Sequence, residues 1–294
     1  MIQPAGFPKI PLEFDYETEV HKSFDGENSI FLNIFRKRDV EIKRALLIIH
    51  GHGEHGGRYA HFPHYLKDRY DLIIAPDLRG HGRSDGLRGH VDSFDEYVDD
   101  AMLAWEVLGK KVSRNTERDW FGHSMGGAVV LRSFYYRPEI EATRIVLSSP
   151  CLGVKVEVPL VKKLAARALA RVWGSLQMTT GIEAGAISHD PAVVEAYQND
   201  QLIHGQATPR FYVGFMQALE ELRNADYRLR DPIRILIQAA AEDNIVDTDV
   251  TRKFFENLKA ADKKLIVYPG LFHEIYNESA KETVFHDWLK WGFE

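Results

Sequence analysis

Short apolar runs separated by helical patterns dominate the sequence from residue 45 onward. Six of these runs predict strands, over residues 45–50, 72–76, 119–121, 144–148, 233–239 and 264–268. Runs of this kind are typical of parallel strands that are buried on both faces and joined by crossover helices. The pattern predicts an α/β fold with a mostly parallel central sheet flanked by helices.

Two further segments near the start of the chain have a different texture. Residues 18–24 and 30–37 alternate apolar and polar positions and flank the turn-prone sequence DGEN, which predicts an antiparallel pair. Ser93 and Glu96 form a capping-box pattern that opens one amphipathic helix. Helical patterns are also predicted over residues 125–136, 251–258 and 281–291.

Residues 151–226 interrupt the alternation of strands and helices. This segment is helical and loop-like, has no convincing buried strand, and lies between the predicted strands 144–148 and 233–239. An α/β core interrupted at this point predicts an inserted helical cap, or lid, of the kind that controls access to a site. We therefore expect a core of residues 1–150 and 227–294 that carries a cap of residues 151–226.

Within the predicted cap, residues 158–174 form a basic amphipathic pattern. Its apolar face consists of Val161, Leu164, Ala168 and Val172. Its basic face consists of Lys162, Lys163, Arg167 and Arg171. Such a helix can lie in a lipid interface, or it can pack its apolar face over the core with its charges in water. The two interpretations are compatible, and the sequence leaves both open.

Composition narrows the class of protein. The 294 residues are 45% hydrophobic and 27% charged, as in ordinary globular proteins, and the formal net charge of −6 gives no reason to expect a nucleic-acid partner. Neither a signal-peptide pattern nor a run of about 18 apolar residues is present, so we expect a cytoplasmic protein with peripheral membrane association through the cap as an option. The single cysteine, Cys151, excludes an internal disulfide and a thiolate-cluster metal site.

A glycine-rich loop follows the first predicted parallel strand. Gly51, Gly53 and Gly56 spell G-x-G-x-x-G, and the next strand ends in Asp77, where a dinucleotide-binding unit carries its acidic residue. On its own this segment keeps an NAD-binding oxidoreductase open as a distant alternative.

A second motif points to different chemistry. Residues 122–126 read G-x-S-x-G between a predicted strand and a predicted helix. In that context the glycines permit a sharp, strained turn that presents the hydroxyl of Ser124 as a nucleophile. The serine then needs a histidine base that is oriented by a carboxylate, in the order serine, acid, histidine along the chain.

Candidates for the acid and the base follow the last two predicted strands. Asp243 lies at the exit of one strand, beside Glu242, while Asp247 is placed to cap the next helix. His273 lies in the loop after the last strand, and its rival His286 falls inside an amphipathic helix. The prediction is a triad of Ser124, Asp243 and His273.

An ester hydrolase also needs two backbone donors for the oxyanion. The residue after the nucleophile, Met125, supplies one N–H group. The other is expected from the loop after the first parallel strand, at His52. This gives the glycine-rich loop a second use.

The motifs together resemble one family. The segments HGHGEHGGRY, DLRGHGRSDG, GHSMGG, SSP, DPAVVEAYQNDQL, AEDNIVD and YPGLFHE occur in order over nearly the whole chain. They are similar to the monoacylglycerol lipase and lysophospholipase group of α/β-hydrolase-fold serine hydrolases. The resemblance implies an α/β-hydrolase fold and a cofactor-free serine esterase that acts on glycerol monoesters of fatty acids.

The resemblance also implies roles for individual residues. Ser124, Asp243 and His273 match the triad, and His52 and Met125 match the oxyanion donors. The positions that surround the glycerol end of the substrate are matched by Glu54, Arg58, His123 and Tyr197. One departure is His52, where the animal enzymes carry a small residue, so its side chain is expected to narrow or polarise the head-group site.

Three other interpretations remain beside a monoacylglycerol lipase. A lysophospholipase or a broad carboxylesterase would use the same triad, and the NAD-binding oxidoreductase is the distant alternative. The histidines near residue 50 are not interpreted as a metal site, because the family loop accounts for most of them.

Overall fold

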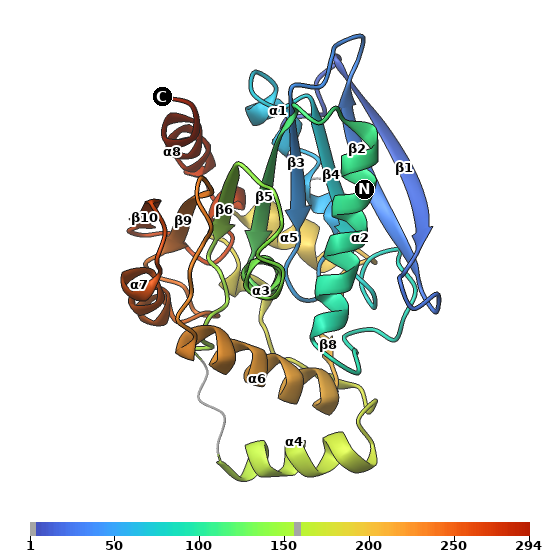
Figure 1. Cartoon of the computed structure of the whole chain (residues 1–294). Coiled ribbons are helices and arrows are strands. Elements are labelled where there is room, and N and C mark those ends of the chain that lie inside the picture. Colours follow the sequence, from blue (N-terminus) through green and yellow to red (C-terminus); the bar gives the residue numbers. More distant parts are fainter. Residues whose placement is uncertain (1–3, 156–159) are drawn as a thin grey trace.

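The computed structural model describes residues 4–155 and 160–294, and one eight-stranded sheet organises them (Figure 1). The strands lie in the order β1-β2-β4-β3-β5-β6-β9-β10. Their bounds are β1 Phe14–Lys22, β2 Ser29–Lys37, β3 Arg44–Ile49, β4 Leu72–Asp77, β5 Glu117–His123, β6 Arg144–Ser148, β9 Arg234–Ala240 and β10 Asp262–Tyr268. Strand β2 is antiparallel to both of its neighbours, and the pairs from β4 to β10 are parallel. The predicted α/β-hydrolase architecture is confirmed.

Helices cover both faces of this sheet. Helices α2 and α3 contribute side chains to one apolar core, and α1 and α8 contribute to the other. The helices of the described chain are α1 Phe62–Leu66, α2 Asp95–Lys111, α3 Met125–Tyr136, α4 Leu160–Val172, α5 Pro191–Asn199, α6 Pro209–Asn224, α7 Thr248–Asn257 and α8 Lys281–Phe293. The capping-box pattern is present at the start of α2, where Glu96 accepts from the Ser93 N–H at 2.9 Å.

Strand β2 is buried on both sides. Although its sequence alternates apolar and polar positions, Leu32, Asn33, Ile34 and Phe35 are all buried. The strand is second from the edge of the sheet, so apolar cores cover it on both sides. The polar exception, Asn33, is satisfied by the Ala75 carbonyl group at 2.9 Å.

The predicted cap segment leaves the sheet after β6 and returns at β9. It contains α4, α5, α6, the 3₁₀ turn Ala184–Ala186, and two short strands, β7 Met178–Thr179 and β8 Gln206–Ala207. Phe211, Phe215 and Leu219 of α6 are buried in the core between the sheet and α2 and α3. In Figure 1, α6 lies between the sheet and α4, so α4 is the outermost helix. The division into a core and a cap that behaves as a unit stays a prediction.

Helix α4 does not pack the apolar face that the sequence pattern indicates. Leu164 is 55% exposed and Val172 is 82% exposed, and Ala168 between them is exposed as well. The half-buried positions include Leu169 and Ala170 instead. Of the two interpretations left open by the sequence, packing of the apolar face over the core therefore does not hold for these residues. The side chains of Val161, Lys162 and Lys163 lie outside the described part of the helix.

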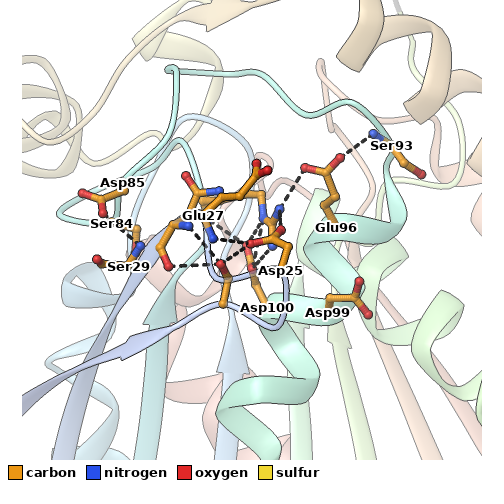
Figure 2. Close-up of polar contacts among 12 residues, drawn as sticks. Asp25, Glu27, Ser29, Ser84, Asp85, Ser93, Glu96, Asp99 and Asp100 are labelled. Atoms are coloured by element: carbon orange, nitrogen blue, oxygen red, sulfur yellow. Dashed lines mark hydrogen bonds and ion pairs between the residues drawn. The ribbon is translucent and has the colours of Figure 1, made fainter.

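A buried arginine fixes the loop after β4. Arg79 donates to Asp100 at 2.8 Å, to Glu96 at 2.9 Å and to Asp25 at 2.8 Å. Figure 2 shows Asp25, Glu96 and Asp100 gathered where the β1–β2 turn meets helix α2. The cluster is structural, since it holds in place the loop that borders the glycine-rich segment.

Candidate active site

Ser124 occupies a strained turn between β5 and α3. Its backbone has φ 52° and ψ −119°, a conformation that residues other than glycine rarely adopt. The neighbouring glycines allow the turn to be tight. A Cβ atom on Gly122 would lie 2.7 Å from the Gly126 carbonyl oxygen, and one on Gly126 would collide with the Ile49 carbonyl oxygen. The motif residues are therefore glycines for a steric reason.

Asp243 and His273 form a buried pair. Asp243 Oδ2 lies 2.7 Å from His273 Nδ1, and Asp243 Oδ1 accepts from the backbone N–H groups of Ile245 and Val246 at 2.8 and 2.9 Å. Both carboxylate oxygens are thus occupied, and Nδ1 of the imidazole carries the proton. Burial alone would lower the pKa of His273, but the Asp243 carboxylate outweighs it and raises the pKa above its ordinary value.

The rival residues lie elsewhere. Asp247 caps helix α7, where its side chain accepts from the Asp249 and Val250 N–H groups. Glu242 is exposed, and the side chain of His286 is 70% exposed on α8. Neither rival acid accompanies Asp243 at the imidazole of His273.

One cavity brings most of the predicted site residues together, while Arg58, Met125 and Asp243 do not line it. Its lining is Gly51, His52, Glu54, His123, Ser124, Ile182, Ile187, Tyr197, Ile245, His273 and Glu274. The core loops supply the hydroxyl and the imidazole, while Ile182, Ile187 and Tyr197 come from the predicted cap. Nucleophile and base candidates thus share a space that the segment after β6 partly closes.

The glycine-rich loop lies directly against the turn at Ser124. A Cβ atom on Gly51 would be 3.2 Å from Ser124 Cβ, and His52 lines the same cavity as Ser124. Met125 is the first residue of α3, so its N–H group has no partner within the helix. The role of these two N–H groups as oxyanion donors stays a prediction.

The side chain of His52 is held by the predicted cap. Its Nε2 donates to the Gln206 carbonyl oxygen at 2.9 Å, and its ring stacks on Phe211 with centroids 4.6 Å apart. Burial, with a smaller contribution from His204, lowers the pKa of His52 to about 3. The ring is therefore neutral at physiological pH, and it joins the loop to the segment above it.

A buried ion-pair network forms the polar end of the cavity. Arg58 donates to Glu54 at 2.7 Å and, through both terminal nitrogens, to the two carboxylate oxygens of Glu274 at 2.7 Å. Glu54 also accepts from the Gly51 N–H at 2.7 Å and from Tyr59 at 2.9 Å. Tyr197 covers the guanidinium, with its ring centroid 5.1 Å from Cζ of Arg58.

Two members of this network, Glu54 and Arg58, are stabilised in their ionised forms. Burial alone would raise the pKa of Glu54, but the charge of Arg58 outweighs it and lowers the pKa to about 2. His123 lies beside the network, with its ring centroid 4.8 Å from that of His273. Burial, together with the nearby His273, lowers the pKa of His123 to about 4, so this imidazole is neutral.

Sequence reasoning missed Glu274. It follows His273 directly and is part of the YPGLFHE segment, but its partner Arg58 is 216 positions away along the chain. The sequence shows only that an acidic residue, Glu274, follows the predicted base. That Glu274 binds Arg58 is shown by the fold.

The loop geometry does not fit a dinucleotide. The Glu54 carboxylate occupies the Gly51 N–H, where a pyrophosphate would need an unopposed donor. After Gly56 the chain forms a single 3₁₀ turn, Gly56–Tyr59, so no long helix starts at the third glycine. Asp77 is buried and accepts from the Gly56 and Arg83 N–H groups. Its carboxylate therefore stabilises the glycine-rich loop.

Comparison with known proteins agrees with this geometry. The profile of the Hydrolase_4 family, described as serine aminopeptidase, S33, matches residues 40–280. Phospholipase YtpA of Bacillus subtilis is 32% identical over 242 residues, which are 82% of this chain and 92% of that protein. A monoacylglycerol lipase of Mycolicibacterium smegmatis is 30% identical over 257 residues, 86% of this chain and 89% of that protein.

Solved structures give the same fold. A monoacylglycerol lipase of Paleococcus ferrophilus superimposes with a TM-score of 0.76 at 25% identity, covering 95% of this chain and 98% of the other. A monoglyceride lipase variant of Saccharomyces cerevisiae, in complex with a substrate analogue, superimposes with a TM-score of 0.80 at 21% identity. The match covers 99% of this chain and 98% of the other. The chain belongs to the Hydrolase_4 family of serine hydrolases and has the α/β-hydrolase fold.

Proposed function

We propose that this protein is a serine esterase that hydrolyses monoacylglycerols to free fatty acid and glycerol. The observation that carries the proposal is one cavity lined by Ser124, on its strained turn, by His273 of the buried Asp243–His273 pair, and by Glu54 and Glu274 of the ion-pair network. The relatives named monoacylglycerol lipase, and the structural neighbours with that title, support the same substrate class.

The proposed reaction has two steps through an acyl-enzyme. Ser124 Oγ attacks the ester carbonyl while His273 Nε2 takes its proton, and the N–H groups of His52 and Met125 hold the oxyanion. His273 then gives that proton to the departing glycerol oxygen. In the second step His273 removes a proton from a water molecule that attacks the acyl carbon. The bond from the acyl carbon to Ser124 Oγ then breaks, His273 returns the proton to Ser124 Oγ, and the fatty acid is released. Asp243 keeps the imidazole in the required tautomer and stabilises its cation.

The polar end of the cavity suits the glycerol. Carboxylate oxygens accept hydrogen bonds from hydroxyl groups, and Glu54 and Glu274 both line the cavity. Tyr197 and His123 complete this end of the cavity. We therefore propose that Glu54, Arg58, His123 and Tyr197 form the head-group site, as the family resemblance implies.

A lysophospholipase is the second candidate, because the relative at 32% identity is a protein named phospholipase. Hydrolysis of a chain-length series of monoacylglycerols is compared with that of lysophospholipids carrying the same acyl chains. The proposal expects higher kcat/KM on the monoacylglycerols, and no turnover in the Ser124→Ala variant with its fold intact. Higher kcat/KM on the lysophospholipids would transfer the function to the second candidate.

We further propose peripheral contact with lipid through α4. Among the described residues, no helix is long and apolar enough to cross a membrane. Leu164 and Val172 are exposed on α4, and Trp173 follows at 60% exposed. Arg167 and Arg171 are exposed on the same helix. An outward apolar stripe with neighbouring cations is the arrangement of interfacial helices.

A further inference from the structure

The head-group end of the cavity carries an excess of negative charge. Among the described residues that line it, the charged side chains at this end are Glu54 and Glu274, and no lysine or arginine reaches the lining. The nearest cation, Arg58, lies behind them with its side chain only 9% exposed. Two carboxylates against one guanidinium leave one uncompensated negative charge.

Glu274 is the residue that creates this excess. Without it, the Arg58–Glu54 pair would be neutral and one side of the guanidinium would be free for an anion. With it, both terminal nitrogens of Arg58 are bound to carboxylates. The ring of Tyr197 covers one face of the guanidinium.

The position of Glu274 is fixed from several sides. Its Oε2 accepts from the Asn277 side chain at 2.8 Å, and its backbone N–H donates to the Ile187 carbonyl oxygen at 2.8 Å. A phosphate that entered the cavity could bind Arg58 only by displacing the bidentate carboxylate of Glu274. The neutral imidazoles of His52 and His123 offer it no compensating charge.

We propose that Glu274 is a specificity-determining residue, which neutralises Arg58 and excludes phosphate-bearing head groups so that the site accepts uncharged glycerol esters. The inference rests on the proposed function and adds to it the charge class of the substrate. Like charges placed together in a buried site are a strong means of rejecting a competing ligand.

The test compares two substrates that differ only in a phosphate group on the glycerol. Hydrolysis of 1-lauroylglycerol and of 1-lauroylglycerol 3-phosphate is measured in neutral detergent micelles for the wild type and for Glu274→Gln. We expect the wild type to prefer the neutral ester by about 100-fold in kcat/KM, and the variant to reduce this ratio by about tenfold or more, mainly through KM of the phosphate ester. The ratio cancels any general loss caused by the change beside His273.

Glu195→Gln is the matched control. Glu195 is exposed on α5, two positions before Tyr197, and removing it changes the net charge by the same amount. Its variant should keep both the wild-type ratio and the wild-type rate on p-nitrophenyl butyrate, which has no glycerol head group. A lowered ratio in Glu195→Gln would show a general charge effect and would overturn the assignment to Glu274.

The outcomes separate the inference from the proposed function. If the wild type hydrolyses p-nitrophenyl butyrate but neither glycerolipid, the proposed function fails and the inference fails with it. If it hydrolyses the glycerolipids and Glu274→Gln keeps the wild-type ratio, the inference alone is overturned. If the variant does not fold, the inference is tested by inhibition of the wild type with 1-dodecylglycerol ether and with its 3-phosphate. Stronger inhibition by the uncharged ether supports the inference, and equal inhibition by the two ethers overturns it.

Discussion

At the scale of single residues, the carboxylate of Asp243 organises the site. One oxygen holds His273 Nδ1 and the other closes its own loop through the amides of Ile245 and Val246. The carboxylate that holds the proposed base, His273, therefore also fixes its own position. A side chain that replaces it must both accept at Nδ1–H and accept from two amides.

Asp243→Asn should remove most of the activity without unfolding the protein. The amide can present N–H to His273 Nδ1, which stabilises the wrong tautomer, and a loss of about 10⁴-fold in kcat is expected by analogy with other triads. The rate on p-nitrophenyl butyrate measures the loss, and circular dichroism reports the fold. A variant that keeps more than a tenth of the wild-type rate would contradict the role of Asp243.

The pH dependence of kcat/KM should follow His273. Because Asp243 raises the pKa of this imidazole above 6.5, the base is protonated and inactive at acidic pH. The rate should therefore increase as pH rises, with an apparent midpoint above 6.5. A pH–rate profile on a soluble ester checks this, and a midpoint clearly below 6.5 would contradict it.

At the scale of elements, hydrophobic pattern predicted most of the architecture. The observed bounds of β6 and α3 coincide with the predicted segments 144–148 and 125–136. Strand β6 has a short apolar run at its centre, and α3 ends shortly before Pro138. Helix α1 was missed since five residues are too short to show a period. For α4, the pattern identified an apolar stripe but could not say whether that stripe meets the core or solvent.

Helix α4 gives a prediction at this scale. Changing Leu164 and Val172 to serine should abolish binding to vesicles that contain anionic lipid, because these exposed side chains supply the apolar contact. Stability should stay within about 0.5 kcal/mol, since both residues are exposed. Vesicle co-sedimentation measures binding, and hydrolysis of a soluble ester confirms an intact site.

Leu12→Ser is the control for that experiment. Leu12 is 89% exposed and lies before β1, remote in sequence from the predicted cap. The control should bind vesicles as the wild type does. Undiminished binding by the α4 double variant would remove this helix from any role at a membrane.

At the scale of the whole molecule, buried neutral histidines connect the loops around the site. His52 reaches the Gln206 carbonyl group, His204 reaches that of Gly80, and His61 contacts that of Tyr276. Burial lowers the pKa of His52 and His61 to about 3 and that of His204 to about 4. Each joins segments far apart in the chain and does so in its uncharged form.

These histidines should make the fold sensitive to acid. Between the native pKa values and about 6.5 the unfolded chain binds protons that the native state does not, so stability falls as pH decreases. Each such group contributes at most about 1.4 kcal/mol per pH unit. Urea midpoints at pH 7.5 and 5.5 should show a clear loss at the lower value.

Two substitutions make that measurement specific. His61→Phe removes one buried imidazole and should reduce the pH dependence, whereas His286→Asn, at an exposed position on α8, should leave it as in the wild type. Equal stability of the wild type at both pH values would contradict the account of the histidines.

The site was predictable from sequence only in part, for a reason that belongs to the whole fold. Ser124, Asp243 and His273 follow strand ends, so their meeting at one edge of a parallel sheet could be predicted from chain order. Glu274 and the contacts of the His52 ring depend on how distant loops and the segment after β6 pack together. Local patterns carry no information on such pairings.

The central claim is that Ser124 is a nucleophile reached by monoacylglycerols. Labelling with a fluorophosphonate, followed by mass spectrometry of the peptides, tests it most directly. We expect one adduct, on Ser124. An excess of 1-lauroylglycerol should slow its formation, and the adduct should be absent in Ser124→Ala. No adduct, an adduct on another residue, or labelling at the same rate with and without the monoacylglycerol would contradict it.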